Sequence, residues 1–185
     1  FTLRVTGMDH YAPESGQLVL ATHPTLIDVV ILISLFPEVD CVVKDAVTRN
    51  PALKMSAGAA NYISNADPAE LLDDCCERLR AGANLMLFPE GTRTTPGKPI
   101  TLKPGAAEIA LRADAPILPI VIDCRPHFLG KHDPWYSIPP RAPTIDIRIL
   151  PPVEPREYVE KGAGDRAARQ AVNRKLLDLF EAGLA

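Results

Sequence analysis

The chain has 185 residues with 46% apolar and 23% charged residues and a formal net charge of −3, a composition typical of one soluble globular domain. The acidic balance argues against nucleic acid as a partner, because surfaces that bind nucleic acid need an excess of lysine and arginine. No apolar run approaches the roughly 20 residues of a membrane-spanning helix.

Strand-like and helix-like patterns alternate along the chain and predict a single α/β domain over residues 1–185, with a mixed, largely parallel sheet flanked by helices. The first residue is Phe, so we expect the sequence to begin inside a longer chain. Whether an N-terminal membrane anchor precedes it is left open. Strands are expected at 2–6, 17–22, 39–44, 84–88, 116–123 and 144–150. Helices are expected at 28–36, 105–113 and 165–183. A further helix is expected to begin after a cap at Asp67 and to end at Gly82. Another is expected within 45–58, where Pro51 interrupts it.

Neither the cysteines nor the histidines form a metal-binding pattern. The four cysteines, Cys41, Cys75, Cys76 and Cys124, contain no C-x-x-C pair and are expected to be reduced core residues. His127 and His132 lie in a proline-flanked loop without an obvious third ligand. We therefore predict no metal site.

A histidine and an aspartate lie five positions apart in "ATHPTLIDVV" (21–30). On one continuous helix this spacing rotates the second residue by about 500°, so the two side chains would point apart. Pro24 ends the preceding strand and Thr25 can cap a helix, so the chain can bend and bring His23 back onto Asp28. The pair would then be a histidine general base oriented by a carboxylate. The alternative is two ordinary polar residues at a strand-to-helix junction.

The stretch "LMLFPEGTRTTPGKPITLKPG" (85–105) is an apolar strand that opens into a long polar loop. In α/β domains ligands bind beyond the carboxyl ends of strands. Arg93 offers a planar fork for phosphate or carboxylate, Gly91 allows close backbone approach, and Lys103 precedes a predicted helix start. These features predict an anion site, with a charged surface loop as the alternative. A second long connection, 123–143, is also a candidate functional loop.

With "THPTLID" and "FPEGTR" in this order, the sequence resembles the glycerolipid acyltransferases typified by lysophosphatidic acid acyltransferase. Two further blocks are similar to the family: "VVKDAVTRNPALKMSAGAANYISN" (42–65) and "ILPIVID" (117–123). The resemblance implies that His23 is the general base and Asp28 its orienting carboxylate. It places acceptor binding at Glu90, Gly91, Thr92, Arg93, Lys103 and Lys44, and at Asn65, where the family usually has an arginine.

The resemblance implies an O-acyltransferase like 1-acylglycerol-3-phosphate O-acyltransferase, with no bound cofactor. The acyl donor would be acyl-CoA or acyl carrier protein, and the acceptor a lysophospholipid or related glycerophosphate. The sequences of the motifs are similar to those of a bacterial branch of the family found beside aryl-polyene and fatty-acid-like pathways. This similarity favours acyl carrier protein as the acyl donor. We expect a cytoplasmic protein that lies peripherally on the inner face of the cell membrane. A thioesterase using the same pair, and a non-catalytic module that binds lipid or carrier protein, are the two alternatives.

Overall fold

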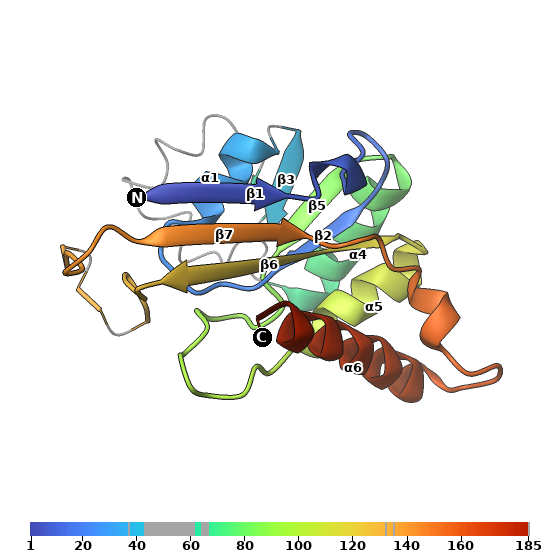
Figure 1. Ribbon diagram of the computed structural model, residues 1–185. Helices are drawn as coiled ribbons and strands as arrows, with labels where there is room; N and C mark the ends of the chain where they lie inside the picture. Colours follow the sequence, from blue (N-terminus) through green and yellow to red (C-terminus); the bar gives the residue numbers. More distant parts are fainter. Residues whose placement is uncertain (37, 43–61, 64–66, 132, 135, 185) are drawn as a thin grey trace.

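The computed structural model describes residues 1–36, 38–42, 62–63, 67–131, 133–134 and 136–184. These contain a sheet, four α-helices and two short 3-10 helices, η1 (Met8–His10) and η3 (Pro155–Tyr158) (Figure 1). The strands are β1 (Thr2–Thr6), β2 (Leu18–Ala21), β3 (Val39–Val42), β4 (Tyr62–Ile63), β5 (Asn84–Leu87), β6 (Ile117–Arg125) and β7 (Thr144–Ile149). The α-helices are α1 (Asp28–Leu35), α4 (Pro68–Arg80), α5 (Pro104–Ala113) and α6 (Asp165–Leu184).

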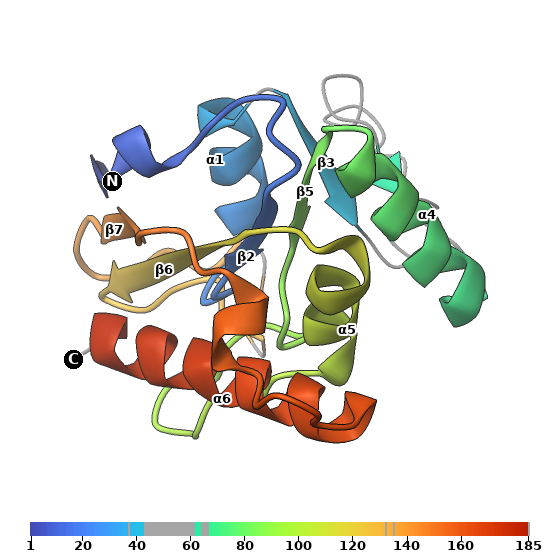
Figure 2. The ribbon, with the colours of Figure 1, turned by 90° about the vertical axis from the view of Figure 1, so that its right-hand side faces the viewer.

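The strands of the described residues form one sheet in the order β1-β7-β6-β2-β5-β3-β4. Every pairing is parallel except that of β6 with β7. Helix α1 covers one face of this sheet, and α4, α5 and α6 cover the other (Figure 2). The prediction of a mixed, largely parallel sheet flanked by helices is therefore confirmed.

The apolar runs of the sequence become a core on both faces of the sheet. Strand β2 lies in the middle and all four of its residues are buried, as expected for a strand covered on both sides. Ile31, Leu32 and Phe36 of the α1 segment pack on one face. Val172, Leu176 and Phe180 of α6 pack on the other. The helices thus hold β2 in a fixed place, and the segment that follows β2 begins from a rigid support.

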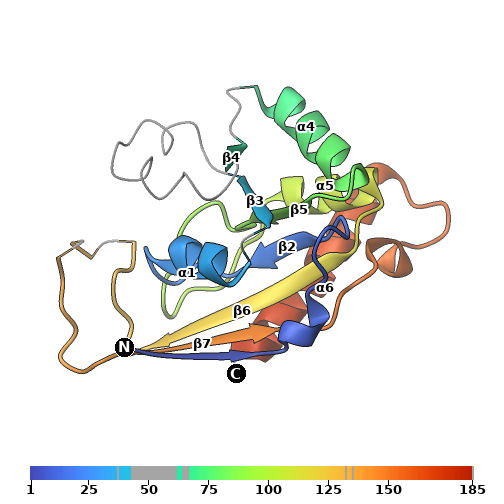
Figure 3. The same cartoon turned by 90° about the horizontal axis from the view of Figure 1, so that it is seen from above.

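Three loops meet at one edge of the sheet because β2 runs parallel to both β5 and β6. They are 22–27 after β2, 88–103 after β5 and 126–143 after β6 (Figure 3). The two long connections of the sequence therefore end beside the candidate histidine. Ligands of α/β proteins bind at this carboxyl edge.

Several expected boundaries shift. Helix α1 begins at Asp28, and its N-cap is Ile27 rather than Thr25. Strand β6 continues to Arg125, beyond the predicted end at 123, because it pairs with β7 along that length. The cap at Asp67 is confirmed, since its Oδ1 accepts from the Ala69 amide at 2.8 Å. The helix expected within 45–58 lies outside the described residues, and β4 was not predicted.

Candidate active site

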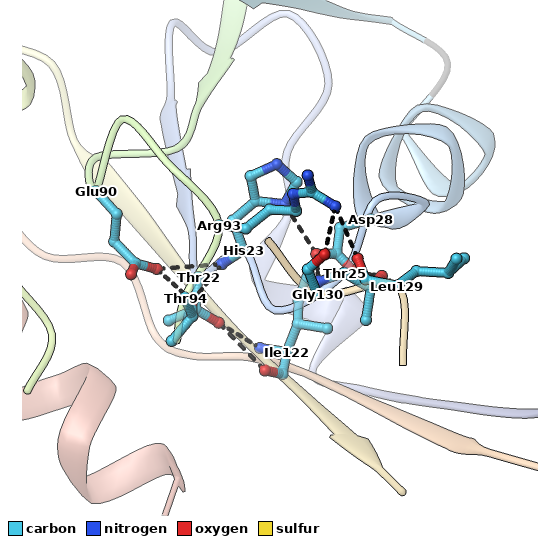
Figure 4. A network of polar contacts seen from close by, with 10 residues as sticks. All are labelled: Thr22, His23, Thr25, Asp28, Glu90, Arg93, Thr94, Ile122, Leu129 and Gly130. Atoms are coloured by element: carbon cyan, nitrogen blue, oxygen red, sulfur yellow. Dashed lines mark hydrogen bonds and ion pairs between the residues drawn. The ribbon is translucent and has the colours of Figure 1, made fainter. Parts of the chain in front are cut away.

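The two residues of the first motif are in direct contact. His23 Nδ1 lies 2.9 Å from Asp28 Oδ2, and the Asp28 side chain is fully buried (Figure 4). A carboxylate can only accept a hydrogen bond, so in this contact Nδ1 carries the proton and a neutral imidazole keeps the lone pair of Nε2. The bend predicted at Pro24 and Thr25 therefore brings the pair together, and the geometry is that of an oriented base.

Thr25 supplies the other hydrogen bonds of the buried carboxylate. Its amide donates to Asp28 Oδ2 at 2.7 Å, and its hydroxyl donates to Oδ1 at 2.5 Å. This corrects the expected role of Thr25, because its hydroxyl serves the carboxylate and not a helix amide. Burying a carboxylate is costly unless hydrogen bonds compensate, and here Thr25 and His23 together supply three.

The ring of His23 is also held by stacking. Its centroid lies 4.2 Å from that of Phe88, with 27° between the two planes. The histidine side chain is 17% exposed, so one part of it reaches solvent. Phe88 on its face and Asp28 on its edge leave the imidazole little freedom to rotate.

The backbone of His23 is bound to the second motif through Thr94 and Glu90. The His23 amide donates to Thr94 Oγ1 at 3.2 Å and to Glu90 Oε1 at 3.3 Å, and the Thr94 hydroxyl donates to Glu90 Oε1 at 2.6 Å. The Thr94 amide donates to the His23 carbonyl at 2.7 Å. These bonds fix the catalytic segment on the 88–103 loop. Sequence reasoning missed Thr94, which had no signal beyond its place one residue after Arg93.

Glu90, expected to bind acceptor, is only 6% exposed, and its carboxylate faces the His23 peptide. Burial raises the pKa of Glu90 above its usual value, while the bonds from Thr94 and His23 act in the opposite direction. The hydrogen bonds from Thr94 and His23 therefore stabilise the charged form of the Glu90 carboxylate.

We expect Thr94→Val to destabilise the protein by about 1–3 kcal/mol, because it leaves a buried carboxylate short of a donor and the His23 amide short of an acceptor. The difference from wild type should shrink as the pH falls through the pKa of Glu90, since the protonated acid carries no buried charge. Chemical denaturation at several pH values measures both effects. Thr94→Ser keeps the hydroxyl and is the matched control. Equal stability of the valine and serine variants would contradict the role given to this hydroxyl.

Arg93 points from the 88–103 loop to the 126–143 loop (Figure 4). Its Nη1 donates to the carbonyls of Leu129 at 2.9 Å and Gly130 at 2.8 Å, and Nη2 donates to that of Lys131 at 3.4 Å. The sequence predicted a fork aimed at an anion. In the structure part of that fork is bound to peptide carbonyls.

The remaining predicted residues fall into two groups. Gly91 has a φ of 66° in the left-handed region, and a Cβ added there would lie 3.5 Å from Lys103 Cγ. The aliphatic stem of Lys103 therefore lies along the loop at Gly91, while Thr92 is exposed. Lys44 and Asn65 lie outside the described residues.

The four thiols do not compete with His23 for a catalytic role. All four cysteines are buried and free, as predicted. Burial raises the pKa of Cys41 to about 12 and that of Cys124 to about 11, so neither supplies much thiolate at neutral pH. Among the described residues, His, Cys, Asp and Glu form no group of three that could hold a metal ion. His132 is not described, so the predicted absence of a site in that loop stays a prediction.

Fold and site together define an α/β protein with a buried carboxylate–imidazole pair at the carboxyl edge of its sheet. The chain matches the model of the family described as Acyltransferase over residues 2–123. It belongs to that family, and the resemblance predicted from the two motifs is confirmed.

Relatives with known names agree with this assignment. The 1-acyl-sn-glycerol-3-phosphate acyltransferase alpha of Mus musculus is 27% identical over 161 residues, which are 82% of this chain and 54% of the mouse protein. The Caenorhabditis elegans protein acl-2 is 33% identical over 154 residues, 79% of this chain and 53% of that protein. The chain thus spans about half the length of these relatives.

A crystal structure shares the fold. The 1-acyl-sn-glycerophosphate (LPA) acyltransferase PlsC from Thermotoga maritima superposes with a TM-score of 0.76 at 23% identity, covering 98% of this chain and 71% of that one. Among the described helices of this chain, none combines the length and apolar character needed to cross a membrane.

Proposed function

We propose that this protein is an O-acyltransferase that moves a fatty acyl group from an acyl thioester to a hydroxyl group. The observation that carries the proposal is the contact of His23 with the fully buried Asp28, which leaves Nε2 as the basic atom. Membership of the Acyltransferase family and the names of the relatives support the reaction class.

In the proposed reaction His23 Nε2 takes the proton of the acceptor hydroxyl, and the oxygen of that hydroxyl attacks the thioester carbonyl. The new C–O bond forms, the tetrahedral intermediate collapses, the C–S bond breaks, and the proton held by His23 goes to the leaving thiolate. Asp28 stabilises the imidazolium between these two transfers, and backbone amides at the loop or helix start stabilise the oxyanion. A base of this kind contributes roughly 10²–10⁴-fold.

The acceptor that we propose is a lysophospholipid or a related glycerophosphate. The mouse relative is named for 1-acyl-sn-glycerol-3-phosphate, and the exposed Thr92, the Gly91 backbone and Lys103 belong to the 88–103 loop, which also bonds to the His23 backbone. Lys44 and Asn65 lie outside the described residues, and we propose them as further acceptor contacts from their place in the family motifs. Because Asn65 stands where the family usually has an arginine, we propose an acceptor whose headgroup is held by one cationic side chain fewer.

The donor in this proposal is acyl-CoA or acyl carrier protein, with no metal and no bound cofactor. We further propose that the protein is cytoplasmic and peripheral, on the inner face of the cell membrane. Exposed apolar side chains support this location: Leu26 is 45%, Val30 50% and Ile138 89% exposed. Leu26 and Val30 lie two residues before and two residues after Asp28, near the start of α1.

A thioesterase that uses the same pair is the second candidate, because the 17% exposed His23 side chain is open to water. Release of thiol from an acyl thioester, measured with and without a panel of hydroxyl acceptors, separates the two. We expect release to need an acceptor and to yield one acylated product per thiol. Release of free acid at a rate indifferent to acceptor would show a hydrolase. Tight lipid or carrier-protein binding without any turnover would show a binding module.

A further inference from the structure

A side chain closes the ladder between β2 and β6. The paired register of the two strands ends with Ala21 opposite Ile120, and the Thr22 amide donates to the Ile120 carbonyl at 3.1 Å. If the parallel ladder continued, the Ile122 amide would bond to the Thr22 carbonyl. It donates instead to the Thr22 hydroxyl oxygen at 2.8 Å, and that hydroxyl donates to the Ile122 carbonyl at 3.3 Å (Figure 4).

The hydroxyl of Thr22 therefore does work that the backbone does elsewhere in the sheet. Thr22 is fully buried, and its hydroxyl is the partner of both the amide and the carbonyl of Ile122. Buried peptide groups need such partners, because leaving them unpaired is costly. The point at which the chain leaves the sheet is thus fixed at Thr22, one residue before His23.

The next peptide groups are held from the 88–103 loop. The His23 amide donates to Thr94 Oγ1, and the Thr94 amide donates to the His23 carbonyl. Thr22 thus fixes where the chain leaves β2, and Thr94 fixes the backbone that follows. This backbone sets the direction of the His23 side chain, whose Nδ1 must reach Asp28. A displacement of about 1 Å in a catalytic group can cost roughly 10²-fold in rate.

Close packing does not surround this segment completely. A cavity of about 370 Å³ lies against it, and the residues that line the cavity include Thr22, Pro24, Thr94 and Ile122. A segment that borders a cavity can shift more easily than one enclosed at the packing density of a protein core. The position of the segment therefore depends strongly on its directional hydrogen bonds.

We propose that Thr22 is a positioning residue for the base: its hydroxyl sets the point at which the chain leaves β2 and, through it, the orientation of His23 toward Asp28. The kinetic part of this inference rests on the proposed function, and the structural part does not. Because Thr22 is fully buried, its side chain does not touch substrate. Loss of the hydroxyl therefore lowers kcat and leaves the KM values of donor and acceptor nearly unchanged.

The test compares Thr22→Val, which has nearly the size of threonine but no hydroxyl, with Thr22→Ser, which keeps the hydroxyl. In the valine variant kcat should fall by about 10–100-fold, with both KM values within about twofold of wild type. The serine variant should recover most of the lost kcat. Thr6→Val alters an exposed threonine of β1 and should match wild type.

The NMR signal of the His23 Nδ1 proton reports the orientation of the ring in the free protein. This proton lies in the hydrogen bond to Asp28, so its signal should be sharp in wild type, Thr22→Ser and Thr6→Val. In Thr22→Val it should broaden or vanish through exchange with water. All variants are compared where denaturation shows them folded, because the valine also leaves buried peptide groups unpaired. If Thr22→Val does not fold, Thr22→Cys takes its place, since a thiol is a weak hydrogen-bonding group.

The proposal is overturned if the variant without the hydroxyl keeps either the wild-type kcat or the wild-type proton signal. It is also overturned if the loss appears in KM, or if serine recovers none of it. If wild type transfers no acyl group to any acceptor, the proposed function fails, and the proton signal alone then decides whether Thr22 orients His23.

Discussion

Replacing His23 with alanine should lower the rate of acyl transfer by roughly 10²–10⁴-fold, the usual contribution of a general base. The substitution removes Nε2, the atom that would take the proton of the acceptor. It leaves the 88–103 loop bonded to the backbone of residue 23 through Thr94 and to the 126–143 loop through Arg93. Thiol release at saturating donor and acceptor measures the effect.

His10→Ala is the control for this variant. His10 is a partly buried histidine of η1, and the bond that Gln17 makes to it uses the His10 carbonyl, which alanine keeps. It should retain wild-type turnover. Because His23→Ala also removes one partner of the buried Asp28, its folded fraction must be measured by denaturation and turnover compared where both proteins are folded. Equal thiol release by wild type and folded His23→Ala would refute the catalytic role.

Asp28→Asn should lower kcat by about 10²–10³-fold while the protein keeps its fold. The Thr25 amide and His23 Nδ1 both donate to Oδ2, so the carbonyl oxygen of asparagine must take that place. Its amide then points to the Thr25 hydroxyl, which can accept as well as donate. The histidine keeps its tautomer and orientation, and only the negative charge beside the forming imidazolium is lost, which corresponds to about 3–4 kcal/mol in the activation barrier.

Asp28→Ala extends this experiment, because it removes both charge and orientation. The gap in kcat between the two variants therefore measures what orientation contributes, and the alanine variant should also unfold at lower denaturant concentration. Asp67→Asn is the matched control, since asparagine replaces aspartate equally well at a helix N-cap. Wild-type kcat in Asp28→Asn would reduce Asp28 to a structural residue.

Local sequence predicted the fold and the pair well, for reasons that particular elements illustrate. The buried run of β2, the Asp67–Pro68 start of α4 and the alternation in β7 depend on residues near one another in the chain. The His23–Asp28 contact spans only five residues, so a bend at Pro24 was enough to foresee it. The N-cap of α1 was placed wrongly at Thr25 because the buried carboxylate competes for its hydroxyl.

The sequence by itself determined the family, the α/β class and the histidine–aspartate pair, because each rests on apolar periodicity or on chemistry within a few residues. The partners that Glu90, Thr94 and Arg93 have outside their own loop were decided by tertiary structure alone. Their bonds reach across 67, 71 and 36 residues of chain and exist only because parallel strands bring three loops to one edge of the sheet. A buried glutamate and a guanidinium bind whichever donors and carbonyls the fold places beside them, and no local pattern records that choice.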